Sequence, residues 1–512
     1  MTAVGELERK TQNRVVKLFI DELGYHYLGN LEDRDNQNIR TGDLENFLFA
    51  YQGFAERKNG QILMRRAIDH LVKTAGNTSL SLFDRNKEVY RLLRYGFQTK
   101  AEPGAQNETV RFIDWKKPER NRFAFAEEVT VKPATAAANG KRPDLVFYVN
   151  GIALGVLELK RSTVDISKGI RQNLDNQKKE FIQPFFSTIQ LILAGSDTQG
   201  LRYGAIQTPE KYYLTWKEDG PDPNLLDKAL RQLCSKDRFL ELIHDFIVFD
   251  GGTKKLCRHN QYFGVKAAQA SVKRREGGII WHTQGSGKSL TMVWLAAWIR
   301  ENIKNSRVLI ITDRTELDEQ IERVFKSVGE TEICRTKSGR DLIDQLNTSK
   351  SSLICSLIHK FGGKENDEAV GDVKGFVEEM QKALPKDFKP KGDIYVFVDE
   401  CHRTQSGVLH EAMTKKILPN AVFIGFTGTP LLKTDKSKSI EIFGRYIHTY
   451  KFDEAVKDQV VLDLRYEARD IDQSITSQTK IDQWFESKTS GLTPLAKAQL
   501  KARWGTMQKV MS

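Results

Sequence analysis

The chain has 512 residues, room for roughly three domains of ~150 residues each, and no apolar run long enough to span a membrane. Residues 1–14 lack the apolar core of a signal peptide and the five cysteines form no C-x-x-C pair, so we expect a cytoplasmic protein without disulfides or a zinc site. The net charge of +12 suits a polyanion such as DNA, although a basic enzyme without a nucleic-acid role would fit it too.

The first 220 residues are predicted to form helices followed by a β-hairpin. Apolar positions recur at helical spacing in 14–23 and 62–72, and residues 144–149 and 152–159 are β-rich. Asn150-Gly151 between these two segments is a strong signal for a tight hairpin turn. A helix is expected after residue 167 and a further strand at 189–194.

This hairpin carries residues that suit metal-dependent phosphodiester cleavage. Asp144 begins its first strand and Glu158 lies near the end of the second, so the turn brings the two carboxylates together, where they can chelate Mg²⁺. Lys160 lies two residues further on the same face of the strand, and it can position a water or steady the developing charge. Alone the pattern is weak, because a solvated strand end also explains it.

The arrangement resembles the PD-(D/E)xK nuclease core. That resemblance implies an accessory glutamine on the next helix, in a Gln-x-x-x-Tyr motif. Gln172 falls at a suitable distance, although Asn176 replaces the tyrosine, and Gln177 with Phe181 is the other frame. Glu127 and Glu128 are two further acids that could lie near this site, but surface acids are common and no role is assigned to them.

A charged segment rich in proline and glycine at 217–224 marks a boundary, and four regions are expected. They are helices with the nuclease domain (1–220), a helical connector (221–257), a motor lobe (258–462) and a polar, helix-prone remainder (463–512). In the third region the β-rich segments 308–312, 353–354, 394–398 and 422–424 alternate with helical patterns, which predicts a parallel α/β sheet.

A phosphate-binding loop opens this third region. An apolar run at 278–281 precedes it and a helical pattern at 290–299 follows, the context that such a loop needs. Glycines let backbone N–H groups surround a phosphate, the lysine reaches the β- and γ-phosphates of ATP, and the serine can hold Mg²⁺. The residues assigned to ATP binding here are Thr283, Gly285, Ser286, Gly287, Lys288 and Ser289. His282 occupies the first glycine position of the usual pattern.

Two further motifs follow buried strands. Asp399 comes directly after 394–398 and is placed to hold Mg²⁺ through its water shell, and Glu400 is placed to orient or deprotonate the attacking water. Thr427 and Thr429 follow the next strand along the chain. With the phosphate loop, these motifs resemble the first, RecA-like motor lobe of superfamily 2 helicases and DNA translocases.

The motor resemblance implies roles for five further residues. Thr427 and Thr429 would couple ATP hydrolysis to DNA movement, and Arg314 would contact the DNA backbone. Gln261 is placed like the glutamine that reads the adenine edge. His402 would relay between the nucleotide and DNA sites, with a buried structural histidine as the alternative.

A nuclease of this type before such a motor resembles the restriction (R) subunit of a type I restriction–modification enzyme. The resemblance implies a subunit that joins methyltransferase and specificity subunits, translocates double-stranded DNA with ATP and Mg²⁺, and cuts unmethylated DNA. One alternative is a stand-alone helicase–nuclease in DNA repair or phage defence. Another is an ATP-binding, DNA-binding assembly subunit with an inactive nuclease, which has no need of the complete set of motif residues.

A motor of this kind needs a second lobe that supplies an arginine finger. Residues 463–512 are too few for that lobe, so we expect them to be its incomplete start. The expectation is therefore a truncated chain with weak or absent ATP-driven translocation.

Overall fold

The structure is a computed structural model that describes residues 3–51, 53–133, 140–312, 315–327, 333–348, 351–357, 373–386, 388–401, 413–429, 443–464 and 478–504. The chain divides into two compact units, Met1–Val461 and Leu462–Ser512. In the described part of the chain, no helix is both long and apolar enough to cross a membrane.

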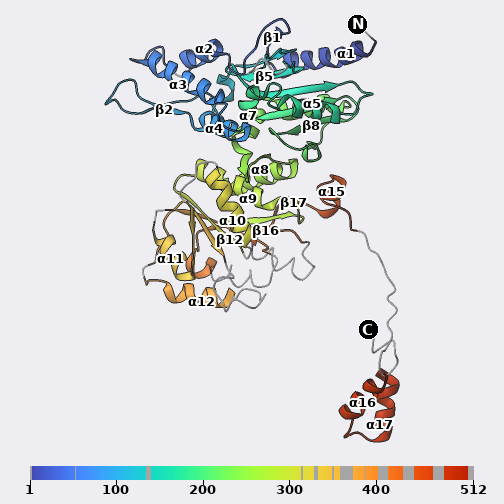
Figure 1. Ribbon diagram of the computed structural model, residues 1–512. Coiled ribbons are helices and arrows are strands. Elements are labelled where there is room, and N and C mark those ends of the chain that lie inside the picture. The colour runs from blue at the N-terminus through green and yellow to red at the C-terminus, as the bar shows by residue number, and fades with distance from the viewer. Residues whose placement is uncertain are drawn as a thin grey trace. The chain divides into compact units, whose positions relative to one another are not determined.

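A six-stranded mixed sheet organises the first part of the larger unit, among the elements coloured blue to green in Figure 1. Its order is β1-β4-β5-β6-β7-β8. The strands are β1 (His26–Asn30), β4 (Phe123–Glu127), β5 (Leu145–Val149), β6 (Ile152–Lys160), β7 (Leu191–Ser196) and β8 (Gly200–Gly204). The predicted hairpin is confirmed as the antiparallel pair β5–β6, and its turn residues Asn150 and Gly151 have φ values of 51° and 83°.

Both faces of this sheet are covered because side chains alternate along each strand. Phe125, Phe147 and Leu157 pack in one cluster with residues of the N-terminal helix, whereas Ala126 and Val146 belong to a cluster on the other face. The helices are α1 (Ala3–Lys17), η1 (Leu18–Glu22), α2 (Thr41–Tyr51), α3 (Gly60–Ala75), α4 (Leu82–Tyr95) and α5 (Ser167–Asn176). Shorter elements are β2 (Phe97–Thr99), β3 (Glu108–Val110), η2 (Pro118–Arg120), η3 (Gln183–Ser187) and η4 (Glu210–Tyr212).

The connector is helical only in part. Helices α6 (Leu225–Cys234) and α7 (Lys236–Asp245) confirm the first half of the prediction, but β9 (Ile247–Asp250) and β10 (Thr253–Leu256) form an antiparallel hairpin. The helical expectation is therefore wrong for residues 247–256. The physical reason is the Gly251-Gly252 turn, with φ values of 55° and 79° that glycine adopts without strain.

A seven-stranded sheet forms the rest of the larger unit, and all of its neighbouring strands are parallel, as the sequence predicts. Its order is β13-β14-β12-β15-β16-β11-β17. The strands are β11 (Gly278–His282), β12 (Ser306–Thr312), β13 (Ile333–Arg335), β14 (Leu353–Leu357), β15 (Asp393–Val398), β16 (Val422–Thr427) and β17 (Tyr446–Tyr450).

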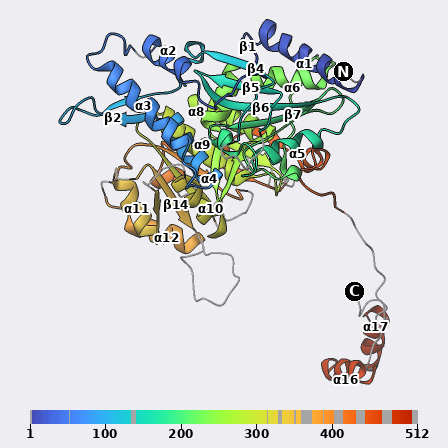
Figure 2. The same cartoon turned by 45° about the horizontal axis from the view of Figure 1, so that its top comes forward.

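Helices cover both faces of the parallel sheet. Residues of α11 and α12 pack with one set of strand side chains, and residues of α8, α9 and α10 pack with the other set; the turned view in Figure 2 shows α11 and α12 beside β14. The helices are α8 (His259–Lys273), α9 (Lys288–Asn302), α10 (Thr315–Ser327), α11 (Gly339–Asn347), α12 (Val373–Ala383), η6 (Met413–Ile417) and α15 (Phe452–Lys457).

The smaller unit contributes two described helices, α16 (Gln478–Lys488) and α17 (Pro494–Trp504). Trp484 and Leu495 are exposed on them.

Candidate functional site

The first candidate site lies where β5 begins and β6 ends. Leu145 pairs with Leu157, and this register places Asp144 opposite Glu158. Asp144 Oδ2 accepts a hydrogen bond from the N–H of Leu159 at 2.7 Å and lies 3.9 Å from Nζ of Lys160. The structure therefore brings together the two carboxylates and the lysine that the sequence singled out.

Glu158 is fully buried among these residues. Burial raises its pKa well above the ordinary value, and the charge and a hydrogen bond of Asp144 raise it further, while Lys160 acts in the opposite sense. A buried carboxylate stays ionised only when positive charge compensates it. The environment of Glu158 is consequently one that a cation would stabilise.

Helix α5 covers Glu158 with two amide side chains. Gln172 donates through Nε2 to Glu158 Oε2 at 2.6 Å, and Nδ2 of Asn176 lies 3.5 Å from Oε1. Asn176 is 1% exposed, and its Oδ1 has no hydrogen-bond partner among the described residues. Gln177 is occupied elsewhere, because it donates to the carbonyl of Asn173. Of the two frames left open by the sequence, the structure places Gln172 at the carboxylate.

Helix α1 contacts two acids beside this site to which sequence reasoning assigned no role, the buried Glu127 and the half-buried Glu128. Gln12 donates through Nε2 to both Glu127 and Glu128, in each case at 3.0 Å, and Arg9 pairs with Glu127 at 3.2 Å. Tyr27 also donates to Glu127. These contacts join residues more than 90 positions apart, so local sequence patterns carry no signal for them.

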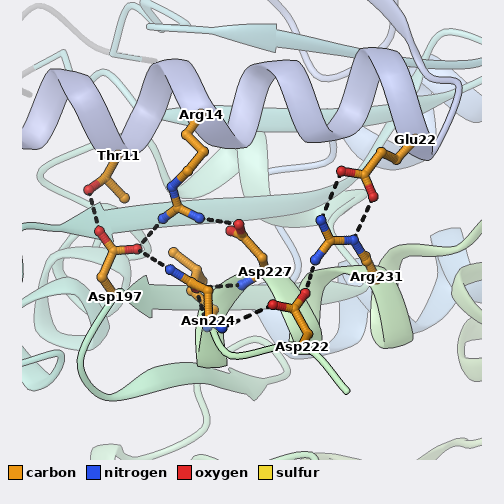
Figure 3. A network of polar contacts seen from close by, with 9 residues as sticks. Thr11, Arg14, Glu22, Asp197, Asp222, Asn224, Asp227 and Arg231 are labelled. Atoms are coloured by element: carbon orange, nitrogen blue, oxygen red, sulfur yellow. Dashed lines mark hydrogen bonds and ion pairs between the residues drawn. The ribbon is translucent and has the colours of Figure 1, made fainter. Parts of the chain in front are cut away.

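Helix α1 is also tied to the turn after β7 and to the connector, as Figure 3 shows. Arg14 pairs with Asp197 and with Asp227 of α6. Arg231 of α6 binds both carboxylate oxygens of Glu22, at 2.6 and 2.8 Å. One helix thus contacts the acids at the end of β4 and the first helix of the connector.

The second candidate site lies at the carboxyl ends of three neighbouring strands, β15, β16 and β11. The phosphate loop follows β11, the acidic motif follows β15, and Thr427 ends β16. In a parallel sheet, the carboxyl ends of the strands lie along one edge, where α/β folds bind ligands. The sheet therefore assembles the three motor motifs in one place.

The phosphate loop is shaped by backbone conformation. Gly285 and Gly287 have φ values of 82° and 91°, which side chains other than glycine rarely adopt. Ser286 closes the turn, because its Oγ donates to the carbonyl of Thr283 at 2.6 Å. Helix α9 begins at Lys288, so Ser289 also lies in its first turn, with the positive end of the helix dipole directed at the loop.

The motif after β16 approaches this loop closely. A Cβ built on Gly428 would lie 2.6 Å from Nζ of Lys288, so only a glycine fits there without a shift. Thr427 is fully buried, and its Oγ1 accepts the N–H of Thr429 at 3.3 Å. Asp399 and Glu400 are buried at the end of β15, with Glu400 at a φ of 46°.

Gln261 lies beside the phosphate loop, at the start of α8. Its Nε2 donates to the carbonyl of Gly287 at 2.9 Å, and its Oε1 accepts the N–H of Arg258 at 2.8 Å. A cavity of about 390 Å³ opens next to it, lined by these residues together with Tyr212 and Leu256. The side chain predicted to read an adenine edge thus borders a cavity that adjoins the loop.

His282 occupies the first position of the loop pattern and is fully buried. Its Nε2 lies 2.9 Å from Nδ1 of His448 on β17. Burial, then the neighbouring His448 and Lys288, hold the pKa of His282 well below its ordinary value. Of the remaining motor residues assigned from sequence, Arg314 and His402 lie outside the described residues.

Known proteins resemble the chain along most of its length. Residues 5–211 match the family model described as "Type I restriction enzyme R protein N terminus", and residues 260–498 match "SWI2/SNF2 ATPase". The type I restriction enzyme HindI endonuclease subunit of Haemophilus influenzae is 30% identical over 509 residues, which cover 90% of this chain and 46% of that protein.

A second relative and a solved structure extend the comparison. The type I restriction enzyme SauCOLORF180P endonuclease subunit of Staphylococcus aureus is 25% identical over 454 residues, covering 86% of this chain and 45% of that protein. The UvsW helicase from bacteriophage T4 matches with 17% identity and a TM-score of 0.29, over 41% of this chain and 66% of that one. The chain spans somewhat less than half the length of these two endonuclease subunits.

The two matched regions follow one another in the order in which the six-stranded and seven-stranded sheets occur in the fold. The chain is therefore similar to type I restriction enzyme R proteins in its N-terminal region and to SWI2/SNF2 ATPases in the region that follows.

Proposed function

We propose that this chain provides the nuclease and the first motor lobe of a type I restriction subunit, which translocates double-stranded DNA with ATP and cleaves unmethylated DNA. The observation that carries this proposal is the pairing of Asp144 with Glu158 beside Lys160, in the same compact unit as a phosphate loop. The residues that the sequence singles out lie together in the structure, and their arrangement supports the proposed PD-(D/E)xK assignment.

The nuclease residues fit a divalent cation. Glu158 is buried beside a second carboxylate, and the orphaned Oδ1 of Asn176 is a further oxygen at the site. Carboxylate and amide oxygens are ligands that Mg²⁺ accepts. Asp144 and Glu158 would hold the ion, which polarises a phosphodiester and lowers the pKa of a bound water.

The chain's own residues have separate tasks in this reaction. Gln172 fixes Glu158 by its 2.6 Å hydrogen bond, which keeps one carboxylate oxygen oriented. Lys160, held near Asp144, steadies the negative charge that develops on the phosphate or positions the attacking water.

Different residues of the motor lobe would bind the phosphates of ATP, hold Mg²⁺ and orient the attacking water. Backbone N–H groups of the phosphate loop and Nζ of Lys288 bind the phosphates, and Ser289 and Asp399 would hold Mg²⁺. Glu400 orients the attacking water. The adenine base of ATP would enter the cavity beside Gln261. Thr427 and Thr429 would couple changes at the phosphate loop to DNA movement, since Gly428 between them lies against Lys288 of that loop.

The proposed partners are DNA and the methyltransferase and specificity subunits of the same system. The test is reconstitution of the full-length subunit with both partners on a plasmid that carries an unmethylated recognition site. We expect cleavage that requires ATP and Mg²⁺ and is absent on methylated plasmid. Equal cleavage without the partner subunits would contradict the proposal and favour a stand-alone helicase–nuclease.

A further inference from the structure

Glu128 directly follows β4 and lies in register with the two proposed cation ligands, Asp144 and Glu158. Glu127 pairs with Leu145, so Glu128 lies opposite Asp144, and its N–H donates to the carbonyl of Asp144 at 2.9 Å. Asp144 in turn lies opposite Glu158. Three acids therefore occupy adjacent positions on three neighbouring strands, a spacing at which the Cβ atoms of opposed residues lie ~5 Å apart.

The side chain of Glu128 contacts Arg142, two residues before Asp144, and the backbone beside it contacts the residue between them. Its Oε2 accepts from Nε of Arg142 at 2.9 Å. The next residue, Val129, donates its N–H to the carbonyl of Pro143 at 3.1 Å. Residues 142, 143 and 144 each contact position 128 or 129, so these contacts tie the start of β5 to the end of β4.

The backbone of Glu128 is strained, with a φ of 51°. A residue other than glycine in this region costs on the order of 1–3 kcal/mol, and such conformations persist only where their surroundings hold them. Glycine would relieve the strain, so backbone geometry alone does not favour glutamate here. The side chain is what distinguishes Glu128 from a glycine, and its carboxylate is the group that contacts Arg142.

Helix α1 holds this carboxylate from the other side. Nε2 of Gln12 donates to Oε1 of Glu128 at 3.0 Å, and Nη1 of Arg9 lies 3.6 Å from the same oxygen. Gln12 is only 4% exposed, so its position is fixed by packing. Arg14 in turn ties α1 to Asp227 on α6 of the connector.

We propose that Glu128 is a positioning residue of the nuclease site, which holds Asp144 in place for the cation, and that Gln12 and Arg9 orient Glu128. This inference rests on the proposed nuclease function. It assigns Glu128 a task that acts through Asp144, because its own carboxylate is directed at Arg142 and Gln12. Loss of an outer residue that orients a metal ligand weakens metal affinity or activity by roughly 10–100-fold.

The experiment measures the Mg²⁺ concentration for half-maximal single-turnover nicking by the reconstituted complex. Glu128→Gly removes the side chain and relieves the strain, so it tests the carboxylate without harming the backbone. We expect Glu128→Gly and Glu128→Ala to raise the required Mg²⁺ by about tenfold or more, with ATPase unchanged. Glu128→Gln should recover part of the loss, because its amide oxygen still accepts one hydrogen bond.

The matched control is Glu32→Ala, because Glu32 also pairs with Arg142 but is exposed and is not one of the three opposed acids Glu128, Asp144 and Glu158. It should leave the Mg²⁺ dependence unchanged. Wild-type Mg²⁺ dependence in Glu128→Gly would overturn the inference.

A second readout separates this inference from the proposed nuclease itself, namely Mn²⁺ binding to the protein without DNA, measured by calorimetry. Asp144→Ala should abolish the nuclease-site binding, and Glu128→Gly should weaken it by about tenfold. Mn²⁺ affinity and stoichiometry that are unchanged in Asp144→Ala would contradict the nuclease site. Binding lost in Asp144→Ala but unchanged in Glu128→Gly would contradict only the role of Glu128.

Discussion

The two sites of this chain are built by different means. At the proposed nuclease site, side chains of α5 contact the fully buried Glu158, and Gln12 of α1 contacts Glu128 at the end of β4. At the nucleotide site, Gln284 and Gly285 are exposed, and the loop is shaped by backbone turns and the start of α9. The first site depends on individual side-chain contacts, whereas the second depends on a backbone conformation that glycine permits.

The comparison predicts that side-chain substitutions at the nuclease site reduce cleavage without affecting ATP hydrolysis. The largest such effect after loss of a cation ligand is expected for Lys160→Ala. Removal of a positive charge that steadies the transition state costs roughly 10²–10³-fold in rate. Single-turnover nicking by the reconstituted complex measures it, with ATPase activity as the internal control. A loss of ATPase activity equal to the loss of cleavage would break the proposed separation of the two sites.

A smaller loss is expected for Gln172→Ala. This residue orients Glu158 by a single hydrogen bond, so cleavage should fall by about 10–100-fold. Gln177→Ala is the matched control, because Gln177 lies on the same segment but donates to the carbonyl of Asn173 instead. An equal or larger loss in Gln177→Ala would show that the other sequence frame is the functional one.

The stability of the folded chain is expected to depend on pH through His282, which lies at the nucleotide site. Burial keeps its pKa well below the usual value, so the folded state stays unprotonated while the unfolded state takes up a proton near pH 6.5. Stability is therefore fully present above that pH and is lost as the pH falls below it, by about 1.4 kcal/mol per pH unit for one proton.

Thermal unfolding between pH 7 and pH 5 measures this slope. We expect His282→Gln to reduce the slope of the unfolding free energy against pH by the contribution of one proton. His26→Gln, at an exposed position, should leave this slope unchanged. If His282→Gln leaves the slope unaltered, the buried pair of His282 and His448 does not make stability depend on pH.

Sequence alone predicted what depends on local pattern. Asn150-Gly151 fixed the hairpin that places Asp144 opposite Glu158, and the β-rich segments predicted the parallel sheet that aligns the motor motifs. The hairpin over residues 247–256 was missed, although the Gly251-Gly252 pair was its signal. Arg314 and His402 remain predictions.

Contacts between residues far apart in the chain could not be predicted from sequence patterns. Gln12 and Glu128 are 116 positions apart, and nothing in either local sequence indicates that they meet. Lys254 lies in the connector that the sequence predicts to be helical, whereas the structure places it on β10, where it is 2% exposed and its ammonium group donates to Asn86 and Gln190. Such contacts come from packing of distant segments, which only the fold defines.

The central claim is that one chain carries a nuclease site and a nucleotide site that fail separately. The most direct measurement compares Asp144→Ala and Lys288→Ala in the reconstituted complex, with nicking and ATP hydrolysis recorded on the same samples. We predict that Asp144→Ala abolishes nicking and spares ATP hydrolysis, whereas Lys288→Ala abolishes ATP hydrolysis and with it nicking. Normal cutting by Asp144→Ala would contradict the assignment of the nuclease.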